Sequence, residues 1–201
     1  MINKKMEMLS GIVLAPWIQK ATALRCKKRK TGGNQFRHAM ATMSILIDYE
    51  FIDPILLKAS VIHDLFEDYP EAANESELRK LDGDGNQVVD LVFEVTKREG
   101  EEKSVFLNRI LTTGTPKAKI LKIADRISNL TDLHLDVIIE EKMEKYLEDT
   151  EKYVIPMAIA VDNKNFIHEL TDLVEIRKLF IKEFKANVSL RNVVKKKLGF
   201  H

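Results

Sequence analysis

Apolar residues recur at spacings of three and four positions along almost the whole chain, and no segment shows a convincing alternation of apolar and polar residues. The first pattern is typical of amphipathic helices, whereas the second is the one that half-buried strands would show. Glycine and proline, the residues that most often interrupt helices, number only 8 and 5 among 201 residues. The pattern therefore predicts an all-α fold, and the length suits a single domain over residues 1–201.

Capping residues and prolines mark the ends of the predicted helices. Asp53-Pro54 and Thr115-Pro116 each combine an N-cap residue with a proline in the first helical turn. The last two predicted helices would form a C-terminal helical appendage over 163–201, added to a core of about 15–162. We expect helices over residues 11–29, 36–49, 53–68, 74–82, 87–96, 104–111, 115–132, 138–162, 165–185 and 188–197.

Charge and hydropathy exclude several classes of protein. Lys and Arg number 32 and Asp and Glu number 31, so the net charge is +1, whereas a general nucleic-acid binder usually carries a strong basic excess. No apolar run approaches the ~18 residues that a membrane span needs. The single cysteine, Cys26, excludes a disulfide scaffold and fits a reducing compartment.

The N-terminal segment partly resembles a secretion signal, because Lys4-Lys5 precede an apolar run and Ala21-Thr22-Ala23 resembles a cleavage site. Two features argue against this interpretation. Glu7 lies between the basic pair and the apolar run, and Gln19-Lys20 lies just before the supposed cleavage site. We therefore expect a cytoplasmic protein that has neither nucleic acid nor membrane as a partner. The sequence does not indicate an oligomeric state.

The most informative polar cluster is His63-Asp64-Leu65-Phe66-Glu67-Asp68, which ends an otherwise apolar predicted helix. On a helix, its imidazole and its three carboxylates share one face, since positions three and four apart are neighbours. Three carboxylates so close would repel one another and raise one another's pKa, a conflict that a bound divalent cation removes. The alternative interpretation is a solvated helix end with a capping histidine.

Two further residues favour the metal interpretation. His38 lies on the preceding predicted helix, and Asp125 lies among apolar residues on a largely core-facing helix, where a carboxylate needs a partner. Together with His63 and Asp64 they form a mixed nitrogen and oxygen set, which suits Mn²⁺, Fe²⁺ or Zn²⁺ better than a metal that prefers thiolates. On an octahedral ion, the positions left open would take water and a phosphate oxygen.

These residues form a pattern that resembles the HD metal-dependent phosphohydrolases. The pattern is similar to the hydrolase domain of RelA/SpoT-type alarmone enzymes, and especially to the small stand-alone alarmone hydrolases. The likeness covers roughly residues 15–162, and it implies an all-α HD-domain helical bundle that removes the 3′-pyrophosphate from (p)ppGpp to leave GDP or GTP. The matching motifs are His38, His63-Asp64-x-x-Glu67-Asp68, Lys122-x-x-Asp125-Arg126-x-x-Asn129-Leu130, Arg29-Lys30 and Val95-Thr96-Lys97.

The resemblance also implies a role for each site residue. Glu67 and Asp68 would orient and deprotonate the attacking water. Arg29 would lie against a guanine base, Lys30 near phosphate, and Asn129 near the ribose or its 3′ substituent. A Mn²⁺-like ion would be held by His38, His63, Asp64 and Asp125.

Departures from the family pattern leave the substrate less defined than the hydrolysis. Leu24 and Lys27 stand where family members usually carry histidine and glutamine, and Asn34-Gln35-Phe36 stands where Pro-Tyr is frequent. Tyr69 replaces the usual threonine. Two alternatives therefore stay open: an HD-type phosphatase acting on another nucleotide, such as a deoxynucleoside monophosphate, and a module that senses a nucleotide without hydrolysing it. The Glu67-Asp68 pair argues against the second, because a sensor does not need to activate water.

Overall fold

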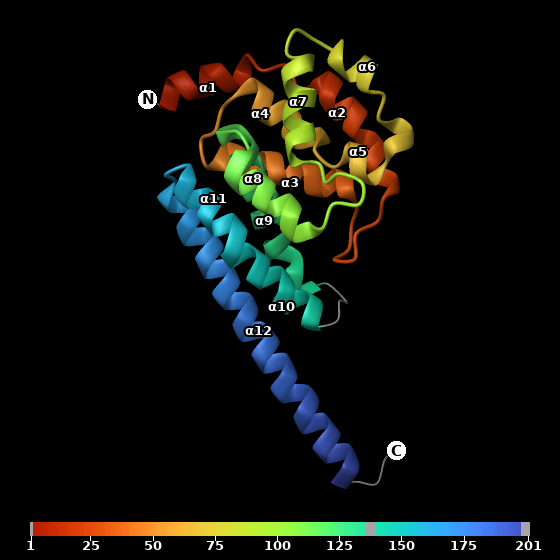
Figure 1. Cartoon of the computed structure of the whole chain (residues 1–201), viewed down its shortest axis with the longest axis vertical. Helices are drawn as coiled ribbons and strands as arrows, with labels where there is room; N and C mark the ends of the chain where they lie inside the picture. The colour runs from red at the N-terminus through yellow and green to blue at the C-terminus, as the bar shows by residue number, and fades with distance from the viewer. Residues whose placement is uncertain (1, 136–139, 198–201) are drawn as a thin grey trace.

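The computed structural model describes residues 2–135 and 140–197, and within these ranges the chain forms helices and no strand (Figure 1). The predicted all-α fold is therefore confirmed. Short 3₁₀ or π turns cover Thr22–Cys26, Pro70–Ala72, Leu133–Leu135 and Thr150–Val154. The α-helices are α1 (Ile2–Ser10), α2 (Ala15–Ala21), α3 (Gln35–Asp48), α4 (Pro54–Ile62), α5 (Leu65–Asp68), α6 (Glu75–Arg79), α7 (Gly85–Val95), α8 (Lys103–Thr113), α9 (Pro116–Asp132), α10 (Glu140–Asp149), α11 (Ile155–Ala160) and α12 (Lys164–Lys197).

Helices α3, α4, α7 and α9 pack against one another at the centre of the bundle (Figure 1). Helix α4 is mostly apolar, and every residue from Leu56 to Ile62 is buried, as expected for a helix that other helices surround. Asp53 and Thr115 cap α4 and α9, since each side chain accepts a hydrogen bond from the backbone N–H three residues further on. These two predicted helix starts are confirmed, and they fix the helices that lead into the candidate site.

The predicted helix over 53–68 is interrupted at His63 and Asp64. Helix α4 ends before these two residues, which form a turn, and α5 begins after them. The backbone of Asp64 has φ −96° and ψ 0°, outside the α region. The prediction of one continuous helix is therefore wrong. The turn coincides with the place where both side chains contact residues of α3 and α9, so tertiary contacts replace the continuing helix here.

Residues 27–34 form a tight basic loop rather than the end of the first predicted helix. An isolated antiparallel bridge between Lys28 and Asn34 closes this loop. Gly32 and Gly33 within it have φ of 92° and 72°, values that glycine adopts without the strain that a Cβ would add. The predicted helix over 11–29 is therefore wrong at residues 27–29, and Arg29-Lys30 lie on the loop instead.

The predicted helix over 138–162 is divided as well. Its described part consists of α10, the π turn at Thr150–Val154 and α11, and residues 136–139 lie outside the described ranges. Pro156 occupies the first turn of α11. Because proline cannot donate the backbone hydrogen bond that an uninterrupted helix requires, the chain changes its helical geometry just before it.

The two helices predicted at 165–185 and 188–197 are one helix, α12, since neither proline nor glycine separates them. It packs on α9, α10 and α11 and extends beyond the rest of the bundle (Figure 1). The division into a core and an appendage stays a prediction.

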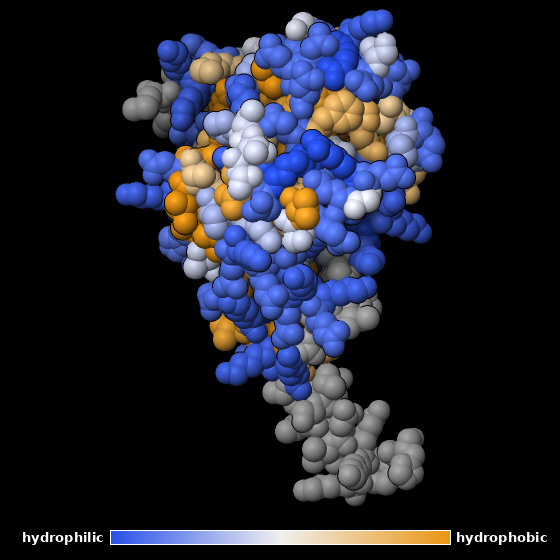
Figure 2. Space-filling model, in the orientation of Figure 1, coloured by the Kyte–Doolittle hydropathy of each residue, from blue (hydrophilic) through white to orange (hydrophobic). Residues whose placement is uncertain are grey.

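Among the described helices, none is both long and apolar enough to cross a membrane. On the face shown in Figure 2, hydrophilic residues cover most of the described surface, in line with the charged residues that make up 31% of the chain.

A bidentate ion pair joins α8 to the loop after α7. Arg109 donates from Nε to Oε1 of Glu101 (2.8 Å) and from NH2 to Oε2 (2.9 Å). The two side chains expose 18% and 8% of their surface. The Arg109 guanidinium lowers the pKa of Glu101 from its usual 4.5 to about 2, although burial opposes this shift.

We expect the stabilisation from this pair to disappear in acid. Because the pKa of Glu101 is lower in the folded chain, the pair stabilises the fold above about pH 4.5, and this contribution is lost as the pH falls toward 2. Glu101→Gln should lower the Tm at neutral pH by at least ~2 °C, since ~1 kcal/mol moves the Tm of a chain of this size by ~2–4 °C. The difference from wild type should shrink through the same pH window. Thermal unfolding followed by circular dichroism measures it, with the exposed neighbour Glu102→Gln as control. A difference that stays constant with pH would assign the effect to packing instead of charge.

Candidate active site

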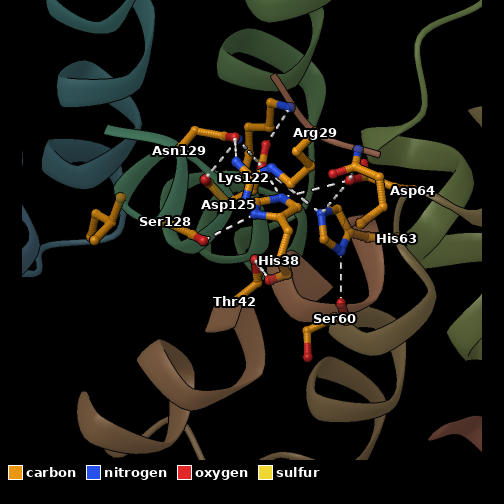
Figure 3. A network of polar contacts seen from close by, with 12 residues as sticks. Arg29, His38, Thr42, Ser60, His63, Asp64, Lys122, Asp125, Ser128 and Asn129 are labelled. Carbon is orange, nitrogen blue, oxygen red and sulfur yellow. Dashed lines mark hydrogen bonds and ion pairs between the residues drawn. The ribbon is translucent and has the colours of Figure 1, made fainter. Parts of the chain in front are cut away.

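Four side chains from α3, the turn after α4, and α9 converge inside the bundle (Figure 3). His38 Nε2 lies 3.0 Å from Asp125 Oδ1 and 3.6 Å from Asp64 Oδ2. His63 Nε2 lies 3.3 Å from Asp64 Oδ2 and 3.8 Å from Asp125 Oδ1. Ligand atoms of the buried His38, His63 and Asp125 lie within 4.8 Å of one another, a group that could hold a metal ion. Asp64 adjoins this group, with 22% of its side chain exposed, so the structure brings the four predicted ligands together.

Each histidine is oriented through its Nδ1 atom. Nδ1 of His63 donates to the Ser60 carbonyl oxygen (2.7 Å), and Nδ1 of His38 lies 3.0 Å from Ser128 Oγ (Figure 3). These contacts turn both Nε2 atoms toward the carboxylates. Nε2 of His63 is buried and has no hydrogen-bond partner among the described residues. The Asp64 and Asp125 carboxylates lie near it without forming a hydrogen bond, and a buried polar atom that lacks a hydrogen bond is costly, so this site fits a cation that would accept the nitrogen lone pair.

The charges of the cluster also fit a cation. Burial lowers the pKa of His63, but the charge of Asp64 and the contact with Asp125 outweigh it and raise the pKa to about 9. Burial alone would raise the pKa of Asp125, yet Lys122 and the two histidines hold it well below its usual range. Lys122 Nζ binds Oδ2 of Asp125 (2.7 Å), which leaves Oδ1 facing the imidazoles. A proton on His63 therefore occupies a position where a divalent cation would bind.

Sequence interpretation missed the residues that orient these ligands. Ser60 and Lys122 each lie three positions before the ligand that they contact, a helical spacing that could have indicated them. Lys122 is the first residue of the motif that contains Asp125, but the resemblance implied no role for it. Ser128 contacts His38 from a helix far along the chain, and no spacing in the sequence indicates that contact.

The two predicted catalytic carboxylates lie on α5 beside this cluster. Glu67 Oε1 accepts a hydrogen bond from the backbone N–H of Lys97, and Asp68 Oδ2 accepts one from Gln35 Nε2. The Glu67 side chain is exposed, but partial desolvation by neighbouring groups still raises its pKa, while the hydrogen bond from Lys97 and the positive charge of Lys122 oppose that rise. A carboxylate with a raised pKa is a better proton acceptor near neutral pH, so Glu67 has the chemistry of a general base.

A cavity of about 240 Å³, which we call the basic pocket, lies next to these carboxylates. Five of the described residues that line it are cationic and none is acidic. Asn129 joins the pocket to the metal ligands, because its Oδ1 accepts from Arg29 NH2 (2.7 Å) while its Nδ2 donates to Asp125 Oδ1 (2.6 Å) (Figure 3). The lining includes the three predicted substrate-binding residues and consists of Lys27, Lys28, Arg29, Lys30, Thr31, Gln35, Asn129, Leu133, Lys142 and Tyr146.

Comparison with known proteins bears on the fold. No protein-family model and no curated protein sequence matches the chain. Among solved structures, 17 chains match it. The helical fold and the His/Asp cluster fit an all-α HD-domain fold. One matching structure is a metazoan ortholog of SpoT that hydrolyzes ppGpp and plays a role in starvation responses; it is 26% identical, has a TM-score of 0.68, and the match covers 87% of this chain and 95% of that chain. The predicted resemblance to RelA/SpoT-type hydrolases is thereby confirmed.

Proposed function

We propose that this protein is a metal-dependent nucleotide phosphohydrolase that removes the 3′-pyrophosphate of (p)ppGpp, leaving GDP from ppGpp or GTP from pppGpp. The observation that carries the proposal is that Asn129 contacts both the metal-ligand cluster and the basic pocket. A metal centre beside a cationic pocket suits an attack of water on a phosphoryl group of an anionic nucleotide. The similar metazoan ortholog of SpoT hydrolyzes ppGpp, which supports this substrate.

The four converging ligands would hold a divalent ion. Mn²⁺ suits their mixed nitrogen and oxygen atoms, and Fe²⁺ and Zn²⁺ are the alternatives. Bound there, the ion would polarise a phosphoryl oxygen and lower the pKa of a water molecule. The protein keeps the ligand atoms in place, since Ser60 and Ser128 orient the imidazole rings and Lys122 binds the second oxygen of Asp125.

Glu67 and Asp68 would prepare the attacking water. Glu67, whose pKa is raised, would accept the proton, and Asp68 would orient the water from the adjoining position on α5. The water oxygen bonds to phosphorus as the bond from phosphorus to the ribose 3′-oxygen breaks, and the released 3′-oxygen takes up a proton to become the 3′-hydroxyl. The products are pyrophosphate and a nucleoside 5′-diphosphate or 5′-triphosphate.

The basic pocket would bind the rest of the nucleotide. Arg29 would stack its guanidinium on the guanine, Lys30 would contact phosphate, and Asn129 would lie near the ribose. The cations that line the pocket match a substrate with pyrophosphates at both its 5′ and 3′ positions. Lys27 and Arg29 already pair with Asp68 and Asp132, but a nucleoside monophosphate would leave Lys28, Lys30 and Lys142 without a phosphate to bind, so the pocket favours the tetraphosphate over the alternative substrate.

We also propose that the protein works in the cytoplasm with a small-molecule nucleotide as its partner and binds neither nucleic acid nor membrane. Cys26 is a free, exposed thiol, which supports a reducing compartment. The near balance of 32 basic and 31 acidic residues supports the absence of a nucleic-acid partner.

Turnover of a nucleotide panel tests the proposed function. Purified protein with Mn²⁺ is incubated with ppGpp, pppGpp, NADPH and nucleoside monophosphates, and the products are resolved by anion exchange. We expect kcat/KM for ppGpp and pppGpp to exceed that for the others by at least about tenfold, because charged groups of the pocket would be left unpaired by the smaller ligands. Preference for a monophosphate would favour the phosphatase alternative, and binding without turnover would favour the sensing module.

Arg29→Lys should raise the KM for ppGpp by about fivefold and leave kcat nearly unchanged. Lysine cannot stack a planar guanidinium on the base, and a partly shielded cation–π contact is worth ~1 kcal/mol. A rise in KM alone is the signature of lost binding that is equal in ground and transition states. Steady-state kinetics measure this, with Arg25→Lys as control because Arg25 is exposed and outside the pocket. An unchanged KM would contradict the role of Arg29 and favour a smaller substrate.

A further inference from the structure

The candidate base Glu67 is held by a peptide group that has a second contact on its other side. Its Oε1 accepts a hydrogen bond from the N–H of Lys97. The carbonyl oxygen of Thr96 belongs to the same peptide group, and it accepts a hydrogen bond from NH2 of Arg109 (3.0 Å). The C=O and N–H of a planar trans peptide group point in opposite directions. One rigid group therefore connects Arg109 on α8 with Glu67 on α5.

Arg109 is itself held in place by several bonds. Glu101 binds its Nε and NH2 atoms at 2.8 and 2.9 Å, and its NH1 donates to the Glu94 carbonyl oxygen at the end of α7 (3.0 Å). Glu101 Oε2 also accepts from the backbone N–H of Arg98 (2.9 Å). The residues on both sides of Lys97 are thus tied to the same ion pair, which fixes the plane of the Thr96–Lys97 peptide group.

The contact with a charged donor has an electronic consequence as well. A guanidinium that donates to a carbonyl oxygen makes a stronger bond than a neutral donor. Chains of hydrogen bonds polarise one another, so a charged donor on the Thr96 carbonyl strengthens the Lys97 N–H as a donor to Glu67. Rotation of the peptide group would break the bonds to Arg109 and Glu67 together.

We propose that Arg109, held by Glu101, is a positioning residue for the hydrolysis. It orients the Thr96–Lys97 peptide group so that the N–H fixes the Glu67 carboxylate beside the metal ligands. This proposal rests on the proposed function, which gives Glu67 the role of general base. Arg109 is neither a metal ligand nor part of the lining of the basic pocket, so its effect should reach kcat through Glu67.

Kinetics in two backgrounds test the positioning. Arg109→Gln should lower kcat for ppGpp by about tenfold, a part of the ~10²–10⁴-fold that a general base contributes, with KM and metal content unchanged. In the Glu67→Gln background, Arg109→Gln should lower kcat by less than about twofold, because the side chain at position 67 no longer accepts a proton and its position matters less. Arg109→Lys keeps the charge and should recover part of the rate. Arg79→Gln, which removes another arginine paired with carboxylates, is the control.

Amide hydrogen exchange tests the geometry without any substrate. Circular dichroism first checks that the Arg109→Gln variant is folded. In this variant, the Lys97 N–H should exchange about tenfold faster than in wild type, while the amide of Leu107, which is buried on the helix that carries Arg109, keeps its rate. If Arg109→Gln does not fold, Glu101→Gln releases the same arginine and is measured in the same two ways.

The outcomes separate this proposal from the proposed function. An unchanged exchange rate at Lys97, or an equal loss of kcat in the wild-type and Glu67→Gln backgrounds, overturns the positioning role. Faster exchange at Lys97 in a protein that hydrolyses no nucleotide would support the link from Arg109 to Glu67 and count against the proposed function.

Discussion

Asp64→Ala is expected to lose the divalent ion and to lower ppGpp hydrolysis by more than about a hundredfold. Removing a residue that only hydrogen-bonds to a metal ligand already lowers metal affinity or activity by about 10- to 100-fold. Asp64 would be a ligand itself, since it lies 3.3 Å and 3.6 Å from the Nε2 atoms of His63 and His38. Its carboxylate would supply both charge and geometry to the ion. Elemental analysis of the purified variant and anion-exchange analysis of its products measure the two effects.

The matched control is Asp172→Ala, which removes an exposed carboxylate from α12. Asp125→Ala should lose the ion as well, and it should also destabilise the fold, because it leaves the half-buried charge of Lys122 without its closest partner. Asp64→Ala is therefore the cleaner variant. Full activity of Asp64→Ala after treatment with EDTA would contradict the metal centre.

Glu67→Gln is expected to lower kcat by ~10²–10⁴-fold, the usual contribution of a general base. Glutamine has nearly the same size, and its carbonyl oxygen can accept the hydrogen bond from Lys97, but it cannot take up the proton of the attacking water. Metal content and KM should stay close to wild type, since Glu67 belongs to neither the metal group nor the lining of the basic pocket. Steady-state kinetics and elemental analysis check this, with the exposed Glu71→Gln as control.

The pH profile gives Glu67→Gln a second readout. The base must be deprotonated, so wild-type kcat should fall as the pH drops through the pKa of Glu67, which lies above the ordinary value of 4.5. The variant should lack this acidic limb. A kcat within about a factor of two of wild type, or an acidic limb that persists in the variant, would show that Glu67 is not the base.

The helical fold could be predicted because the burial of one helix face requires a regular spacing of apolar residues, which the sequence shows directly. A helix packed on one side must place apolar residues three and four positions apart, and the caps at Asp53 and Thr115 are local contacts that the sequence displays directly. The basic loop could not be predicted in the same way. Its shape depends on Gly32 and Gly33 with positive φ and on a bridge between Lys28 and Asn34, a pairing that helical spacing does not indicate.

The candidate ligands could be found because His38, His63, Asp64 and Asp125 stand in motifs with a recognisable pattern. Among the groups that support them, Ser60 and Lys122 lie at a helical spacing that could have indicated them, whereas Ser128 and Arg109 do not, since their partners come from other elements. Ser128 orients His38, and Arg109 reaches the Thr96 carbonyl, through contacts that only the packing of the bundle creates. For these two residues, the position in the fold is what reveals the supporting role.

Restoration of activity by metal tests the central claim most directly. Protein stripped with EDTA and dialysed is mixed with ppGpp, Mn²⁺ is then added, and the products are resolved by anion exchange over time. We predict no hydrolysis before the addition, and afterwards GDP and pyrophosphate formed in equal amounts. Hydrolysis by the stripped protein, or release of orthophosphate from the 5′ end without GDP, would contradict a metal-dependent 3′-pyrophosphohydrolase.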